Sequence, residues 1–281
     1  EIISQLRAGS SPEEVKERFR QVLENVNSVE IAQIEQELVE EGMPREEIQR
    51  LCDVHMAVFR DQLEKRKLDV PLGHPINILM EEHKAMLQIA ENLGTIASKL
   101  GKINDKSYVV DELHELEHVS ASFEDSEKHY LREENVLFPT LEKHGVTEPP
   151  AIMWAEHNEI REKKKQLGRL VRGFGDSSFQ DFKTQLLATS KSLNSLLPNH
   201  FYKENNILFP TALQIITSEE WKASRADFNE IGYCSFTPQH LISTARTDAQ
   251  GEEKMTTQED TLKFETGSLS KEEIEAILDT L

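Results

Sequence analysis

Two stretches of the chain repeat nearly the same thirteen residues. Residues 129–141 read HYLREENVLFPTL, and residues 200–212 read HFYKENNILFPTA. Each copy begins with a histidine and places a glutamate four residues later. Because residues i and i+4 lie on the same face of a helix, each copy presents an imidazole and a carboxylate toward one side. Each pair is a candidate half of a metal site.

Two further histidines precede the two copies, and each of them directly follows a glutamate. His83 lies 46 residues before His129, and His157 lies 43 residues before His200. The chain therefore encodes a helix with a histidine followed by a helix with His-x-x-x-Glu, twice. If these helices fold as a bundle, four imidazoles and the two repeated carboxylates share one interior.

The repeated glutamates, Glu133 and Glu204, need a compensating charge in such an interior. Burying an unpaired carboxylate costs roughly several kcal/mol, and two divalent cations supply the missing charge. Two bridging carboxylates with two histidines per metal define a dinuclear site of the kind that helix bundles hold. Nitrogen and oxygen donors suit iron or manganese, and zinc is also compatible. A single His–Glu pair is often only an exposed surface pair, but the duplication favours a metal site.

Long amphipathic segments are expected to position these residues. Short separators containing glycine, proline or asparagine divide the segments, so neighbouring helices are expected to run antiparallel. The pattern predicts an all-α fold, an up-down-up-down four-helix bundle, with helices at roughly residues 75–100, 107–143, 149–172 and 177–215.

The regions on either side of the bundle predict smaller units. A capping box at Ser11 opens a small N-terminal helical domain. Beyond the bundle we expect a short helix, a polar linker over residues 243–260 and a connector helix that is capped by Ser270. The expected regions are residues 1–70, 71–216 and 217–281.

Composition excludes several classes of protein. The formal net charge of -19 argues against binding to nucleic acid or to an anionic membrane surface. No apolar run approaches the roughly 20 residues of a membrane span. The two cysteines, Cys52 and Cys234, lie far apart, which fits a reducing cytoplasm better than a disulfide framework.

Residues 75–213 resemble the hemerythrin-like, HHE cation-binding family. The signature of that family is a histidine on the first helix, His-x-x-x-Glu on the second, a histidine on the third and His-x-x-x-Glu on the fourth. The residues that match position by position are His83, His129, Glu133, His157, His200 and Glu204. The resemblance implies a non-haem di-iron centre that Glu133 and Glu204 bridge.

One position departs from the oxygen-carrying members of that family. They have a fifth histidine four residues before the third-helix histidine, and this chain has Met153 there. The departure argues against oxygen carriage on their pattern. His74 and His144 are spare histidines that either complete the ligand set or are ordinary helix-end and loop residues.

The rest of the chain resembles a longer architecture. The stretch IEQELVEEGMPREEIQRLCDVHMAVF resembles a domain of unknown function that precedes hemerythrin-like domains in bacterial and archaeal proteins. The stretches EIGYCSF and FETGSLSKEEIEAILDTL resemble the segment that joins such proteins to a C-terminal PAS sensor domain. The resemblance implies a downstream sensor domain as a partner, and a terminal helix is compatible with a homodimer.

Several side chains near the candidate ligands have two interpretations. Glu82 and Glu156, which precede ligand histidines, either support those histidines or lie on the surface. Asp125, one turn before the first repeat, either supports a ligand or lies on a solvated face. Tyr130 and Phe201 follow the repeated histidines and are predicted to be core aromatics.

Two other pairs have spacing that permits chemistry. His114 and His118 are four residues apart, and we expect them on the solvated face of an acidic helix. Cys52 and His55 are three residues apart and either bind a metal or haem or pack in a core. No C-x-x-C-H stretch exists, so covalent haem attachment is excluded.

These observations favour a binding and sensing module. The expected ligand is O2, NO, peroxide or iron, and the expected output runs through residues 217–281. The main alternative is an enzyme that reduces NO or peroxide, or a protein that repairs iron–sulfur centres. A weaker alternative is metal storage or a purely structural bundle.

Overall fold

The structure, a computed structural model, describes residues 36–39, 42, 44, 68–176, 178–243, 261–264 and 267–270. Two compact units divide the chain, residues 1–241 and residues 242–281. Within the predicted N-terminal domain, residues 36–39 are helical. The predicted capping box at Ser11 and the Cys52–His55 pair lie outside the described residues.

The first bundle helix is α5, Pro75–Lys102. His74 caps it, since the His74 Nδ1 atom accepts a hydrogen bond from the Ile76 N–H at 3.2 Å. Pro75 occupies the first turn, where its missing N–H costs nothing because that N–H has no partner within a helix. The cap fixes where the helix starts and so sets the rotation of its buried face, which carries His83.

The second bundle helix is not the single helix that was expected over residues 107–143. Ser126 interrupts it because its hydroxyl donates to the Phe123 carbonyl at 2.7 Å and competes with the helical hydrogen bonds. The elements are a short 3-10 helix (Lys106–Tyr108), α6 (Val110–Asp125), α7 (Glu127–Arg132), a π-helical turn (Glu133–Leu137) and α8 (Phe138–Lys143).

The third and fourth bundle helices follow in the expected order. The fourth is also interrupted by a π-helical turn, which comes at the same place in the repeat as in the second. The elements are α9 (Glu148–Arg172), α10 (Phe179–Lys203), a π-helical turn (Glu204–Leu208) and α11 (Phe209–Ile215). α12, Ser218–Ile231, comes next, and Thr217 and Glu220 form its capping box.

The π-helical turns explain residues that the two repeats share. In each turn the N–H five residues after the glutamate, from Phe138 or Phe209, bonds the carbonyl of Glu133 or Glu204. The following proline has no N–H to continue the ladder. Side chains instead donate to carbonyls four residues earlier: Asn135 to Leu131 and Asn206 to Tyr202 at 2.8 Å, and Thr140 to Val136 and Thr211 to Ile207 at 2.7 Å.

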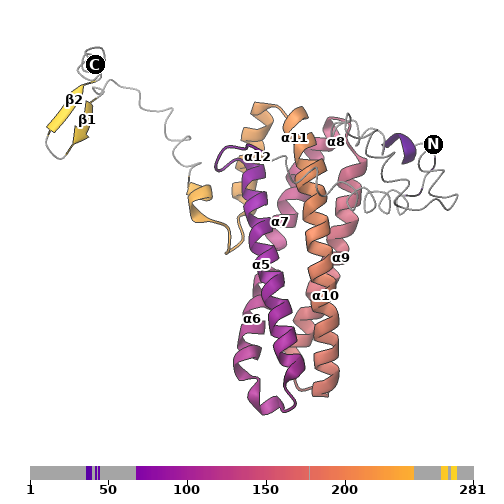
Figure 1. The fold of residues 1–281 in the computed structure, drawn as a ribbon. Coiled ribbons are helices and arrows are strands. Elements are labelled where there is room, and N and C mark those ends of the chain that lie inside the picture. The colour runs from indigo at the N-terminus through magenta and orange to yellow at the C-terminus, as the bar shows by residue number, and fades with distance from the viewer. Residues whose placement is uncertain are drawn as a thin grey trace, which may run out of the picture. The chain divides into compact units, whose positions relative to one another are not determined.

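The helices form a bundle in which each packs on its neighbours in sequence (Figure 1). α5 lies between α6 and α10, and α9 lies on the opposite side between the same two helices. The prediction of an all-α, up-down-up-down four-helix bundle is therefore confirmed. α12 packs on α5 and α7, and residues through Leu241 belong to the same compact unit.

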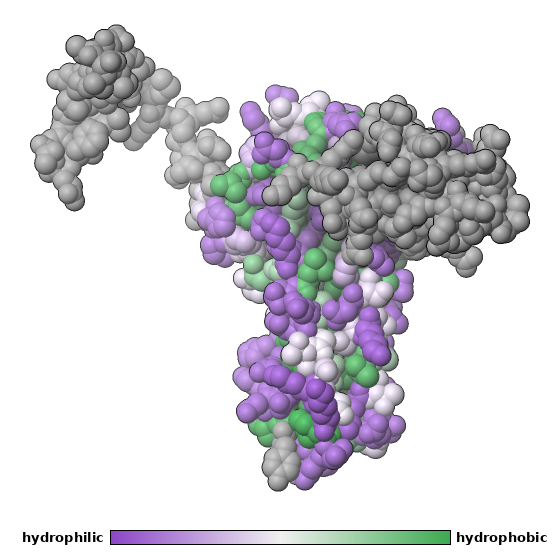
Figure 2. Space-filling view, viewed as in Figure 1, coloured by the Kyte–Doolittle hydropathy of each residue, from purple (hydrophilic) through white to green (hydrophobic). Residues whose placement is uncertain are grey.

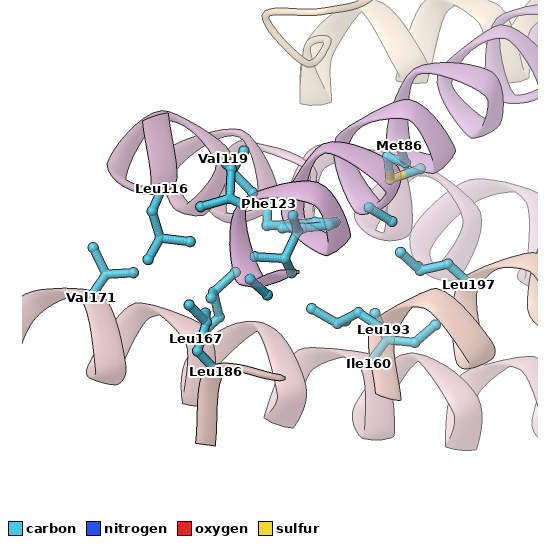
Figure 3. Packing of buried hydrophobic residues seen from close by; sticks show 14 of the residues in the cluster. Met86, Leu116, Val119, Phe123, Ile160, Leu167, Val171, Leu186, Leu193 and Leu197 are labelled. Carbon is cyan, nitrogen blue, oxygen red and sulfur yellow. The ribbon is translucent and has the colours of Figure 1, made fainter. Parts of the chain in front are cut away.

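A continuous apolar core runs between the four helices. Leu116 and Phe123 of α6 face Ile160 and Leu167 of α9, and Leu193 of α10 lies beside them (Figure 3). All five side chains are buried. The same core includes Tyr130 and Phe201, which directly follow two of the candidate histidines, so it also holds the helices together beside the site.

The exposed face of the bundle is mainly polar. Figure 2 shows hydrophilic side chains over most of the visible bundle, with isolated apolar ones between them. None of the helices in the described residues is both long and apolar enough to span a membrane.

The second compact unit contains a hairpin that was not predicted. Strand β1, Thr261–Phe264, pairs antiparallel with β2, Gly267–Ser270, and Thr261 faces Ser270. Ser270, which was expected to cap a helix, ends β2. Of the linker expected over residues 243–260 only Ser243 is described, and the helix expected over residues 271–281 lies outside the described residues.

Candidate metal centre

The six residues of the repeated pattern meet in the interior of the bundle. α5 carries one of them, α9 another, and the ends of α7 and α10 with their π-helical turns carry the other four. All are at most 2% exposed: His83, His129, Glu133, His157, His200 and Glu204. Burial of six polar side chains at one level requires partners that satisfy them.

The six side chains form two clusters that share both glutamates. One cluster contains His83, His129, Glu133 and Glu204, and in the other His157 and His200 join the same two glutamates. Within each cluster the four ligand atoms lie within 4.8 Å of one another. This is the arrangement that two metal ions with two bridging carboxylates require.

Individual distances show how the donor atoms converge. In the first cluster, His83 Nε2 lies 3.2 Å from His129 Nε2 and 3.1 Å from Glu204 Oε2. In the second, Glu204 Oε1 lies 2.9 Å from His200 Nε2 and 3.5 Å from His157 Nε2. Glu133 Oε2 lies 3.5 Å from His129 Nε2 and 3.4 Å from His157 Nε2, so it faces both clusters.

Most of the nitrogen and oxygen atoms that face the centre of the clusters have no hydrogen-bond partner. Both carboxylate oxygens of Glu133 and Glu204, and Nε2 of His157 and His200, are buried without a hydrogen-bond partner. Unsatisfied buried polar atoms are costly, and native proteins seldom retain them in groups. Their convergence fits cations that coordinate nitrogen and oxygen, such as iron, manganese or zinc.

Every histidine of the clusters is held by its other ring nitrogen. The Nδ1 atom of His129 lies 2.8 Å from Glu82 Oε2, and that of His200 lies 2.8 Å from Glu156 Oε2. A carboxylate at Nδ1 fixes the tautomer and turns Nε2 toward the metal position. The structure thus places both glutamates against histidines of the two clusters and not on the surface.

The other two histidines have partners that the sequence analysis did not single out. His157 Nδ1 lies 2.7 Å from Glu134 Oε1, and His83 Nδ1 lies 3.2 Å from Asn205 Oδ1. Glu134 and Asn205 occupy equivalent positions, directly after the shared glutamates. Their place in the repeat is the sequence signal that identifies them.

Each supporting glutamate is paired with a buried cation at an equivalent place in the repeat. Arg132 Nη2 donates to both oxygens of Glu82 at 2.7 and 2.5 Å, and Lys203 Nζ donates to Glu156 Oε1 at 2.6 Å. Burial alone would raise the pKa of either carboxyl, but the neighbouring histidine and cation lower the pKa to about 2 in both. Both carboxylates therefore remain anionic beneath the ligands.

The histidines respond to the same charges. Burial would lower the pKa of His157, but the neighbouring carboxylates of Glu133, Glu134 and Glu204 raise that pKa to about 10. Burial lowers the pKa of His83 despite its contact with Glu204. Without metal, a proton on His157 therefore balances part of the carboxylate charge.

Aromatic side chains enclose the imidazoles. Phe201 stacks on His83 with ring centroids 4.0 Å apart, and Tyr130 lies 4.6 Å from His157. Both aromatic residues are at most 1% exposed and belong to the main core, as predicted. They restrict water at the clusters as well as stabilise the bundle.

Three predicted candidates lie away from the clusters. The ring of His74 packs against Trp221 at 4.5 Å, and its Nδ1 atom is used in the α5 cap. His144 ends α8 and lies 2.9 Å from Glu220. Asp125 pairs with Lys128 at 2.6 Å and accepts the Ser235 N–H. Each has a local partner, so none of the three completes either cluster.

Two further expectations concern the neighbourhood of α6 and α9. His114 and His118 lie on the exposed surface, with their Nε2 atoms 3.1 Å apart. Met153, at the position of the absent fifth histidine, is buried among apolar residues. The clusters therefore draw no donor from either place.

A small cavity of about 140 Å³ lies on the outer side of His200. Its lining includes Glu156, Asn199 and Lys203. The cavity therefore lies beside the second cluster and contacts Glu156, the carboxylate that holds His200.

The bundle and its two clusters define a helical metal-binding protein. Residues 74–212 match the family described as the Hemerythrin HHE cation binding domain. Residues 1–65 match a family of unknown function, DUF438. The chain therefore carries a DUF438 region followed by a hemerythrin HHE cation-binding domain. No curated protein matches the chain.

Proposed function

We propose that this chain binds a pair of iron ions and uses them to sense a small molecule. The observation that carries the proposal is the sharing of Glu133 and Glu204 between two buried clusters. His83 and His129 would hold one ion, and His157 and His200 the other. The six ligands proposed from the sequence would supply this whole set.

A di-iron pair supplies redox chemistry and a coordination position for O2, NO or peroxide. The protein's own part is to orient and protect. Glu82 and Glu156 hold two imidazoles through Nδ1, and Glu134 and Asn205 hold the other two. Phe201 and Tyr130 cover the imidazole faces.

Sensing is favoured over oxygen transport by two features. Met153 stands where the oxygen-carrying members of the family have a fifth histidine. The residues that follow the bundle also contact the layer that supports the ligands, because Thr237 donates to Glu82 at 2.5 Å. A downstream sensor domain and a homodimer would fit this role in a signalling or stress-response protein.

The alternative is catalysis, either reduction of NO or peroxide or repair of iron–sulfur centres. The cavity beside His200 favours it, since a substrate needs a route toward the buried ions. In that case Tyr130, Glu82 and Glu156 would surround a site of catalysis, whereas in a sensor they would surround a site of reversible binding.

The two functions are separated by one experiment on the full chain. Anaerobic protein loaded with Fe(II) is mixed with NO or peroxide in a stopped-flow instrument, and absorbance and consumption are followed together. A sensor gives one saturating spectral change, about one ligand per centre, with no continued consumption. Sustained consumption of NO or peroxide would establish the enzyme instead.

A further inference from the structure

The two halves of the metal centre are alike in sequence but differ in what covers them. Glu82 with Arg132 in the first half corresponds to Glu156 with Lys203 in the second. In the second half the cavity of about 140 Å³ lies against this pair. In the first half, the chain that follows α12 lies against Glu82 and Arg132 in place of a cavity.

The covering stretch, residues 233–241, is here named the docking segment. α12 ends at Ile231, and Gly232, whose φ is +87°, turns the chain as it leaves the helix. The segment is fixed at its far end by Arg225 of α12, which donates to the Leu241 carbonyl at 2.9 Å. Cys234 and Thr237 within it are each 2% exposed.

The docking segment makes several contacts with the first half. The Thr237 hydroxyl donates to Glu82 Oε1 at 2.5 Å, and Arg132 Nη2 lies 3.9 Å from Cys234 Sγ. The Ser235 N–H donates to Asp125. The Arg132 guanidinium also lies over the Tyr233 ring, 4.9 Å from its centroid.

These contacts join the docking segment to a ligand in two hydrogen bonds. One oxygen of Glu82 faces His129 Nδ1, while the other accepts from Thr237. Binding of a metal at His129 Nε2 would fix the ring with Nδ1–H toward Glu82. Without that constraint the His129 ring can turn. Glu82 is then still paired with Arg132 but is no longer positioned from the His129 side for its hydrogen bond with Thr237.

We infer that the docking segment reports the state of the metal held by His83 and His129. Thr237 is a positioning residue, because it contacts Glu82, which in turn holds His129. A metal bound to His129 would stabilise the same two contacts and so keep Thr237 in place. The segment stays docked when the ion is bound and opens more often when the ion is absent. The inference rests on the proposed di-metal function and adds to it the route by which the centre acts on the chain beyond the bundle.

The thiol of Cys234 provides a direct readout of opening. Burial raises its pKa to about 12, so the docked thiol reacts slowly. In a full-length Cys52→Ser background it is the sole cysteine. Alkylation by N-ethylmaleimide is timed in metal-free protein and in protein loaded with Fe(II). We expect the loaded protein to react about tenfold more slowly, within the usual range of coupling between two sites.

Two variants test the route. Thr237→Val keeps the shape of the side chain and removes the hydroxyl, and its alkylation rate should no longer depend on metal. Because coupling is reciprocal, Fe(II) affinity of the first site should fall by a similar factor. Glu156→Gln changes the equivalent residue in the uncovered half, and its Cys234 alkylation should remain metal-dependent. Thr189→Val, which removes another buried hydroxyl that bonds only within α10 at 2.9 Å, controls for general destabilisation.

Hydrogen exchange of residues 233–241 in the unmodified chain, with and without Fe(II), gives a second test that does not depend on a variant folding. Faster exchange without metal supports the inference. Equal alkylation and equal exchange in a chain that binds both ions would overturn the inference and leave the proposed di-metal function intact. A chain that binds no metal would overturn both.

Discussion

The imidazole of His129 and the carboxylate of Glu82 form a 2.8 Å hydrogen bond, and the repeat reproduces it at the same distance between His200 and Glu156. Partners of this kind fix the tautomer of a ligand and raise its basicity. Glu82→Gln and Glu156→Gln are each expected to lower metal affinity about 10- to 100-fold. Competition with a chromophoric chelator measures the change.

The two substitutions should also act on different ions. Each should weaken one of two binding steps and leave the other near its original affinity. A Glu142→Gln variant, in which the changed residue is exposed on α8, is the matched control for loss of one carboxylate charge. Unchanged affinity in both glutamate variants would contradict the assigned role of these carboxylates.

Arg132 and Glu82 are a buried ion pair, with both side chains fully inaccessible to solvent. Arg132→Ala leaves the carboxylate without its cation and is expected to lower the free energy of unfolding by about 3–5 kcal/mol. Arg132→Lys introduces the residue that the second half uses and should cost clearly less. Urea unfolding of the metal-free protein measures both, and equal losses would contradict the pairing.

Metal binding is expected to release protons. The pKa of His157 is raised to about 10 in the metal-free chain, so this residue carries a proton at neutral pH that a metal must displace. Metal affinity should therefore increase with pH, by up to about tenfold per pH unit for each displaced proton, and level off above about pH 10. Chelator competition at several pH values measures the slope.

The same pKa has an opposite consequence for the metal-free fold. A histidine whose pKa is higher in the folded chain than the ordinary 6.5 stabilises that fold at low pH. The stabilisation is complete below about pH 6.5 and is lost as pH rises through about 10. Glu134→Gln removes one carboxylate beside His157 and should lower both the proton release and this pH dependence. A pH-independent metal affinity would contradict the account.

The spacing of the histidines and glutamates was sufficient to predict where the clusters form. His83 and His157 could be paired with the two repeats because helical periodicity is local and the halves have the same order. The bundle followed from the amphipathic segments and their short separators. The helices and the positions of the histidines and glutamates on them depend on residues that are close in sequence. The spacing of residues therefore predicts them directly.

The remaining features depend on contacts between distant residues. Asn135 and Thr140 are ordinary helix residues until the π-helical turn places them beside carbonyls that need a donor. Thr237 lies 155 residues from Glu82, and no periodicity links the two. His74 and His144 were candidates by residue type alone. In the structure His74 caps α5, and His144 contacts Glu220 at the end of α8. Long-range polar contacts of this kind are set by packing.

The measurement that tests the central claim most directly is the metal content of the full chain and of its Glu133→Ala and Glu204→Ala variants. Protein is purified anaerobically, loaded with Fe(II), desalted and analysed by inductively coupled plasma mass spectrometry. Both glutamates are shared by the two clusters, so the unmodified chain should retain about two ions and each variant should lose both. Fewer than about one ion per chain, or a content that neither substitution changes, would contradict the dinuclear site.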